Sequence, residues 1–501
     1  MNIEKLQLFY SKNKIPILYG ILLLISAVLI FLNNNYSYIW YDEGYTIALI
    51  RYSYIDIWQL TATDVHPPLY YYLLKAYVSI TGFSLENVRF FSAIPILLTI
   101  IAGCTIVRKL WGDKTAIFFI IITLLTPATH YMASEIRMYS WCMFFVLMAF
   151  LYAYISYMKG TKSSFFLLAL FSLMAAYTQY YGLMAAAVIY GIYFFLFLFN
   201  KRKEILPFII SALVFGIAYI PWLIHLITQL TEVSSNYWIT SDSTAGMIEY
   251  FFPVATFKHA GISWLDKRSL EVMIPVVFFI FILISAIKTG KKKIYTEGII
   301  AALAFLFPIL FGLTYSYLVS PVFYPRYVCC SIGLYYLAFA LFITSVDLSK
   351  VYNKTVIIIF FIVFTIMSIT ALRNKVVFDQ GRTKEQNEII SYINEEKSSE
   401  TAILYQEDIS LPFPILFPDY GHITKTDNKS RPVEAAQYII STSFDHIKIP
   451  TYTNIDPQYQ YLYAINPSYT KKDSAELFQN FDIISHRNIR AIDIYKMKKK
   501  E

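Results

Sequence analysis

Long apolar runs separated by short polar connections dominate the first 372 residues of the chain. They fall near residues 15–32, 90–107, 115–130, 140–158, 163–178, 182–199, 205–228, 271–287, 298–318, 327–346 and 355–372. A helix needs roughly 18 or more apolar residues to cross a hydrocarbon core of about 30 Å. The pattern therefore predicts a polytopic α-helical membrane protein with about 11 spans.

One further apolar segment, 67–82, is ambiguous, because it would reach only about 24 Å as a helix and carries Lys75 in its middle. Basic residues accumulate in cytoplasmic loops. With this segment on the membrane surface, the cytoplasmic segments hold 17 Lys and Arg residues, against 8 outside, Arg89 among them, up to residue 327. We therefore predict a cytoplasmic N-terminus and one long outer loop, 33–89, whose helix from Pro67 lies along the interface.

After residue 372 the pattern changes to shorter amphipathic segments. Residues 382–397 are typical of a helix, 401–406 and 436–442 of strands, and 481–498 of a hairpin. We predict two domains, a membrane module over 1–372 and a small extracytoplasmic soluble α/β domain over 373–501. Because the second contains no nucleophile elbow, phosphate loop or metal spacing, we expect it to act as a lid or to position an acceptor.

Composition agrees with a multi-pass plasma-membrane protein that contacts membrane lipids. The chain is 57% hydrophobic and 15% charged, and its net charge of +8 is spread over short loops, which argues against nucleic-acid binding. The cysteines lie within or at the edges of apolar runs, without the spacing of a disulfide framework or a zinc site.

The interiors of the predicted spans contain no Asp, Glu, Lys or Arg, and the candidate chemistry lies in the outer loops. The candidates are Asp42, Glu43, Asp64 and His66 in the first loop, Glu135, Arg137 and Tyr139 in the second, and Tyr324 and Arg326 in a later one. A pocket that joined them would suit glycosyl transfer from a lipid-linked sugar phosphate. A carboxylate can deprotonate an acceptor hydroxyl, and guanidinium groups can stabilise the departing phosphate.

Simpler interpretations of the same residues remain open. The Asp-Glu pair could be a solvated boundary of the first span, and the two arginines could contact lipid headgroups. His66 could cap the helix that follows it. It could also bind a divalent metal together with Asp64 and Asp42, so the metal dependence of the protein is left undecided.

The motifs "WYDEGY", "HPPLYYYLL", "NVRFFSAIPILL", "ASEIRMYS" and "FYPRYV", in this order, resemble the polyprenyl-phosphate-dependent membrane glycosyltransferases of the GT-C fold. The chain is most similar to family 39, the protein mannosyltransferases and aminoarabinose transferases. The resemblance implies an inverting transfer on the extracytoplasmic face, with Asp42 as the essential acid and Glu43 beside it. It also implies that Arg326 faces the donor phosphate and that Glu135 and Arg137 line the same cavity.

Two departures narrow the expected substrates. The resemblance to the aminoarabinose enzymes implies an arginine two residues after the Asp-Glu pair and a lysine before the Pro-Pro pair, but this chain has Tyr45 and His66 at these positions. The chain also has no room for the β domain of the protein mannosyltransferases. We therefore expect a polyprenyl-phosphate sugar as donor and a lipid or glycan of the cell envelope as acceptor, with protein disfavoured. The alternatives are a lipid-linked glycan flippase or transporter, and an oligosaccharide polymerase or ligase with a diphosphate-linked donor.

Overall fold

The structure is a computed structural model, and it describes residues 3–34, 36–233, 280, 284, 287–288, 292–395, 398, 400–406, 412–425, 446–449, 454–466, 471–489 and 492–500. The chain forms two compact units. The first contains Met1–Asn35, His66–Tyr70 and Ile80–Val376, and the second contains Tyr36–Val65, Tyr71–Ser79 and Val377–Glu501.

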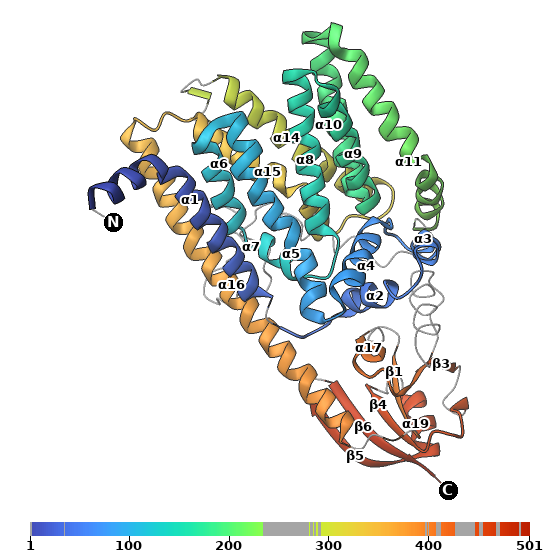
Figure 1. Ribbon diagram of the computed structural model, residues 1–501. Helices are drawn as coiled ribbons and strands as arrows, with labels where there is room; N and C mark the ends of the chain where they lie inside the picture. Colours follow the sequence, from blue (N-terminus) through green and yellow to red (C-terminus); the bar gives the residue numbers. More distant parts are fainter. Residues whose placement is uncertain are drawn as a thin grey trace. The chain divides into compact units, whose positions relative to one another are not determined.

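The first unit is helical (Figure 1). Its helices are α1 (Ile3–Asn33), α5 (Leu85–Ala102), α6 (Arg108–Leu125), α7 (Pro127–Ser134), α8 (Tyr139–Lys159), α9 (Lys162–Thr178), α10 (Tyr180–Asn200), α11 (Ile205–Val233), α14 (Lys292–Leu318), α15 (Ile332–Ser345) and the first part of α16 (Val351–Asn394). Within the described residues, 7 helical segments are long and apolar enough to cross a membrane, and α9 and α15 are shorter apolar helices.

The predicted spans coincide with these helices, apart from 271–287, which lies almost entirely outside the described residues. Two predicted boundaries are wrong. The run 327–346 begins in the 3-10 turn Pro325–Cys330, and α15 starts only at Ile332. The run 115–130 ends as a helix at Leu125, because Thr126 is extended and Pro127 begins the separate helix α7. The short α8–α9 turn is explained by Gly160, which has φ +62°, and by Thr161, whose side chain accepts the Ser164 N–H.

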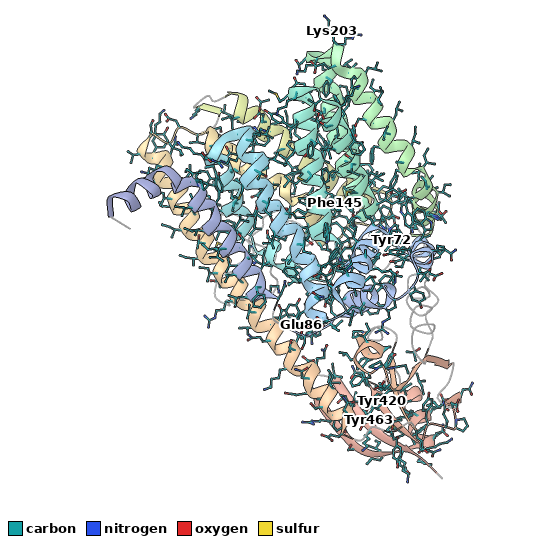
Figure 2. All side chains as sticks on the ribbon, in the orientation of Figure 1. Tyr72, Glu86, Phe145, Lys203, Tyr420 and Tyr463 are labelled. Atoms are coloured by element: carbon teal, nitrogen blue, oxygen red, sulfur yellow. The ribbon has the colours of Figure 1, made fainter. Side chains whose placement is uncertain are left out.

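Helix α8 forms the core of the first unit. It packs against α5, α9, α10 and α15, and Phe145, labelled in Figure 2, is buried near its middle. Helices associate in lipid through close packing, which small residues permit. At Gly182 of α10, a Cβ atom would lie 2.4 Å from the Ala175 carbonyl oxygen and 2.7 Å from Cys142 Sγ. Any larger residue there would force these helices apart.

The second unit contains a six-stranded sheet in the order β3-β2-β1-β4-β6-β5. Its strands are β1 (Thr401–Gln406), β2 (Gly421–Lys425), β3 (His446–Ile449), β4 (Tyr461–Ile465), β5 (Phe481–Ile489) and β6 (Ile492–Lys499). β1 pairs in parallel with β2 and β4, and β5 and β6 form an antiparallel hairpin. The strand expected over 401–406 and the hairpin over 481–498 are confirmed, whereas 436–442 lies outside the described residues.

Alternating residues of the sheet face two apolar cores. Ile403, Tyr405 and Tyr463 pack with the end of α16 and with α17 (Pro412–Leu416), while Ala402 and Leu404 pack with α19 (Lys471–Asn480) on the other face. Figure 2 labels Tyr463 and the nearby Tyr420, whose hydroxyl donates to the Ile393 carbonyl at 3.1 Å. The helix expected over 382–397 is the end of α16, which runs without interruption to Asn394.

The predicted outer loop contains three helices, α2 (Tyr41–Leu49), α3 (Tyr54–Thr63) and α4 (Leu69–Thr81). The sequence predicted only the last of these, and placed its start at Pro67. The helix begins two residues later, at Leu69, because Pro68 disfavours the helical conformation at Pro67, the residue before it. At 13 residues, α4 is too short to cross a membrane, as expected.

Candidate functional site

The two acids of the first loop lie in the first turn of α2, but in different environments. Glu43 is completely buried, and its carboxylate accepts the backbone N–H of Trp40 at 3.4 Å. Asp42 is partly exposed. Negative charges are stabilised at a helix N-terminus, where backbone N–H groups lack intrahelical partners. Glu43 therefore helps to begin the helix, and Asp42 is the carboxylate of the pair that can meet another molecule.

The residues before α2 lie beside charged side chains of α16. The Arg382 guanidinium is 5.3 Å from the centre of the Tyr38 ring, and Arg382 Nη1 is 3.2 Å from the Glu385 carboxylate. Burial raises the pKa of the Tyr38 hydroxyl, the positive charge of Arg382 opposes this, and the negative charge of Glu43 adds to it. The Tyr38 hydroxyl is therefore neutral, and its ring packs against the Arg382 guanidinium.

Asp64 and His66 flank the connection between α3 and α4. Asp64 is the C-cap residue of α3, where its backbone N–H donates to the Thr61 carbonyl, and its side chain is buried. His66 is also buried, and it lies three residues before the start of α4, so it is not the cap of that helix. Among the described residues, no group of three or more His, Cys, Asp or Glu side chains is placed to hold a metal ion.

Glu135 and Arg137 lie in the sharp connection between α7 and α8 in the first unit. Glu135 has an extended backbone as the C-cap of α7, and the Arg137 N–H donates to the Glu135 carbonyl at 2.7 Å. The relative exposures of the two residues are 4% and 3%. Burying charged groups is expensive unless other polar groups compensate, so this connection is built to hold charge inside the protein.

Arg326 comes to the same place from a different part of the chain. It lies in the 3-10 turn Pro325–Cys330, with its guanidinium carbon 5.2 Å from the centre of the Tyr324 ring and 5.9 Å from that of Tyr139. Aromatic faces attract cations at this range and restrict the orientation of the planar guanidinium.

Tyr139 connects the two groups. Its side chain is buried, and the charges of Arg326, Arg137 and Glu135 all act on its hydroxyl. That hydroxyl is buried without a hydrogen-bond partner in the described part of the chain. The structure thus brings together five predicted site residues, which we call the guanidinium cluster: Glu135, Arg137, Tyr139, Tyr324 and Arg326.

Arg89 of α5 was missed as a site residue by sequence reasoning. The sequence analysis counted it only as an outer-loop charge, but its side chain is completely buried and Nη1 donates to the Ser134 carbonyl at 2.7 Å. This bond fixes the end of α7 immediately before Glu135. The available signal was an arginine inside the apolar string "NVRFFSAIPILL", where a charge needs a partner within the protein.

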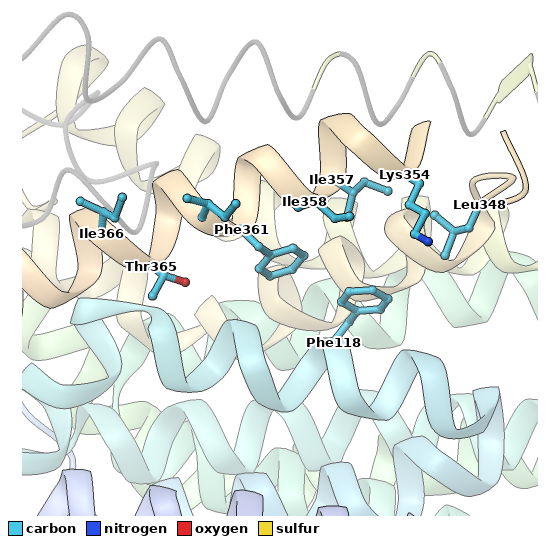
Figure 3. A pocket seen from close by; sticks show the side chains of 9 residues that line it. Phe118, Leu348, Lys354, Ile357, Ile358, Phe361, Thr365 and Ile366 are labelled. Carbon is cyan, nitrogen blue, oxygen red and sulfur yellow. The ribbon is translucent and has the colours of Figure 1, made fainter. Parts of the chain in front are cut away.

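A groove of about 590 Å³ lies between α6 and α16 (Figure 3). Phe118 of α6 and Phe361, Ile362 and Ile366 of α16 are among its lining residues, and Lys354 is the only charged residue among them. With no carboxylate or second cation in this lining, the groove lacks the groups that sugar transfer needs.

Residues 65–225 match the model of the family described as dolichyl-phosphate-mannose-protein mannosyltransferase. This region contains Arg89 and three residues of the guanidinium cluster, Glu135, Arg137 and Tyr139. The recognition made from the motifs is confirmed, and the match supports the enzyme class it implies, a glycosyltransferase that uses a lipid-linked sugar.

Two solved structures share the fold over nearly the full length. ArnT from Cupriavidus metallidurans bound to undecaprenyl phosphate is 11% identical, with a TM-score of 0.64, and the match covers 95% of this chain and 97% of that one. The same protein in the apo state gives 11% identity, a TM-score of 0.63 and the same coverage. The search among curated proteins finds no match. The GT-C fold and the multi-pass membrane location expected from the sequence are thus confirmed.

Proposed function

We propose that the protein transfers a sugar from a polyprenyl-phosphate donor to a lipid or glycan acceptor of the cell envelope. The guanidinium cluster carries this proposal. Arg137 and Arg326 outweigh the single carboxylate of Glu135, which leaves a positive charge in a largely buried, aromatic environment. Electrostatic attraction for a departing phosphate is strong where water is excluded, and the Tyr139 hydroxyl is a further hydrogen-bond donor for it.

The lipid part of the donor is proposed from the fold. The related ArnT structure holds undecaprenyl phosphate, and the apolar helices of the first unit give the present chain a hydrocarbon environment in which such a tail would dissolve. We propose the same chemical class, a sugar joined through one phosphate to a polyprenyl chain, as the donor here.

The reaction we propose is a single displacement with inversion at the sugar carbon. The acceptor oxygen forms a bond to this carbon, the carbon–oxygen bond to phosphate breaks, and polyprenyl phosphate leaves with the electron pair. Asp42 accepts the proton of the acceptor hydroxyl. We assign this role to Asp42 because Glu43 is completely buried and its carboxylate is used by the Trp40 amide. Asp64 and His66 are proposed as neighbouring substrate-binding groups.

The assay uses the purified full-length protein in liposomes with radiolabelled polyprenyl-phosphate sugar and a cell-envelope extract as acceptor. We expect label in the extract, release of polyprenyl phosphate, and loss of both in Asp42→Asn. Retained transfer in Asp42→Asn would exclude Asp42 as the base. Translocation of the donor without transfer would favour a flippase, and transfer only from a diphosphate-linked donor would favour a polymerase or ligase. Activity that a strong chelator abolishes would establish a metal requirement.

The orientation is also part of the proposal: a cytoplasmic N-terminus, and an outer loop 33–89 and domain 373–501 on the extracytoplasmic face. In a cysteine-free background, Gln59→Cys in α3 and Lys109→Cys in α6 would place thiols at exposed positions of the loop and of a cytoplasmic segment. An impermeant thiol reagent should label only the first in whole cells. The opposite pattern would invert the orientation.

A further inference from the structure

The short segment Ser37–Ile39, just before α2, is held by two side chains of α16. The Thr383 hydroxyl oxygen accepts the backbone N–H groups of Ser37 and Tyr38, each at 3.3 Å. The Gln386 amide oxygen accepts the Ile39 N–H at 3.1 Å, and its amide nitrogen donates to the Ser37 carbonyl, also at 3.1 Å. All of these contacts lie within the second unit.

Gln386 pairs with this segment as a neighbouring strand would, since one amide group both accepts from and donates to the backbone. The Gln386 side chain is buried, and so is Ile39. A buried backbone N–H that lost such a partner would pay the desolvation cost without compensation. The Arg382 guanidinium packs on the ring of Tyr38, the residue between Ser37 and Ile39. The segment therefore has one strongly preferred position against α16.

The position of this segment determines that of Asp42, which follows Ile39 by three residues. Trp40 follows Ile39 directly, its N–H donates to the Glu43 carboxylate, and its carbonyl accepts the Gly44 N–H at 2.9 Å as the first bond of α2. A helix beginning is set by the residues that precede it. Fixing Ser37–Ile39 therefore fixes both the direction in which α2 starts and the place of Asp42 in its first turn.

We propose that Thr383 and Gln386 are positioning residues for Asp42, through which the extension of α16 beyond the membrane controls the reaction. This inference rests on the proposed function, because it needs Asp42 as the base. A base must be within hydrogen-bond reach of the proton that it takes, and a displacement of about 1 Å can cost on the order of 100-fold in rate.

A merely structural role would predict a different pattern of effects. If the contacts only stabilised the fold, removing them would reduce the amount of folded protein, and the folded fraction would keep its kcat. If they position the base, kcat should fall while the KM for the donor, which depends on other groups, changes little. Conservative variants that keep the hydrogen bonds should keep kcat.

The experiment compares Thr383→Val, Gln386→Leu and the double variant in the reconstituted full-length protein. We expect kcat about 10 to 100-fold lower for the double variant, KM for the polyprenyl-phosphate sugar within about 3-fold, and faster hydrogen exchange at residues 37–39. Thr383→Ser keeps the hydroxyl, and its kcat should be close to that of the wild type. Gln380→Leu makes the same change at an exposed position of the same helix, and it should leave kcat unchanged.

Two results would overturn the inference: an unchanged kcat in the double variant despite faster exchange at residues 37–39, or a decrease confined to KM. If the double variant does not fold, the single variant Thr383→Val decides, because it removes the acceptor for the Ser37 and Tyr38 N–H groups and leaves both Gln386 hydrogen bonds in place. An unchanged kcat there, with faster exchange, would equally reject the inference. An active Asp42→Asn would instead reject the proposed function, so the two failures are distinguishable.

Discussion

The guanidinium cluster and the acidic start of α2 hold their charges in opposite ways. In the first unit, Arg137 is buried between α7 and α8, and the partly exposed Arg326 lies against the rings of Tyr139 and Tyr324. Partial exclusion of water strengthens the attraction of both guanidinium groups for an anion. In the second unit, Asp42 is partly exposed in the first turn of a nine-residue helix. A phosphate needs a fixed, dry cationic environment, whereas a base must release its proton after each turnover, and the two environments correspond to these needs.

Substitution of Asp42, in the first turn of α2, should lower kcat more than any other change. We expect Asp42→Asn to lower kcat by about 100 to 10,000-fold, the range of general base catalysis. Glu43→Gln removes a buried helix-initiating carboxylate, so we expect about 1 kcal/mol lower stability and less than about 10-fold lower kcat. Stopped assays with labelled donor and thermal unfolding would measure both. Equal loss of kcat in the two variants would contradict the separate roles assigned here.

Substitutions of the two arginines in the guanidinium cluster should have the second-largest effect on activity. Arg326→Lys and Arg137→Lys keep the charge but lose the planar fork that can hold two phosphate oxygens, so we expect kcat/KM for the donor to fall about 10 to 100-fold. Binding of polyprenyl phosphate should weaken in parallel. Arg202→Lys, on an exposed 3-10 turn, is the matched control and should have no effect. Unchanged phosphate-lipid binding in both cluster variants would rule out this site.

Tyr139→Phe should have a smaller and more specific effect. The ring that contacts Arg326 remains, and only the hydroxyl is removed. Because that hydroxyl has no partner among the described residues, its loss should leave the melting temperature unchanged or slightly higher. If it donates to the donor phosphate, kcat/KM should fall about 3 to 10-fold, the value of one hydrogen bond. A lower melting temperature with unchanged kinetics would assign it a purely structural role.

The smallest effect should appear in the β5–β6 hairpin, which contains none of the candidate site residues. Hydrogen bonds from Asn488 and then His486 lower the pKa of the exposed Asp493 carboxyl below its ordinary 3.8. A depressed pKa stabilises the fold above the ordinary value, and this contribution is lost as the pH falls through the folded-state pKa. Asp493→Asn should therefore exchange hairpin amides slightly faster than the wild type at pH 7. The difference should vanish in strong acid, and a difference that grew with acidity would contradict this sign.

The sequence predicted those parts of the fold that follow from local patterns. Apolar runs located the spans, because a helix in lipid must satisfy its backbone internally and cover itself with apolar side chains. A short strand-like run located β1, and a hairpin-like segment located β5 and β6. The short helices α2 and α3 were missed, since at 9 and 10 residues they depend on tertiary contacts more than on their own pattern.

For the candidate site, the sequence pointed to the right loops but not to all the residues that shape them. Glu135, Arg137 and Arg326 stood out as charges beside apolar runs. Arg89 was overlooked because net loop charge treats every arginine as exposed. The contacts from Thr383 and Gln386 to Ser37 and Ile39 join residues more than 340 positions apart, and no local pattern carries that information.

The same distance along the chain has a consequence for the order of synthesis. Ser37 leaves the ribosome early, and Gln386, its partner on α16, follows 349 residues later. At about 5 to 20 residues per second, the loop waits roughly 20 to 70 s before that partner exists. A chain released before α16 is complete would already hold its first loop and most of its helices, yet it would lack the support for its acid. If Thr383 and Gln386 position Asp42 as proposed, transfer cannot begin before residue 386 of the 501 has been made.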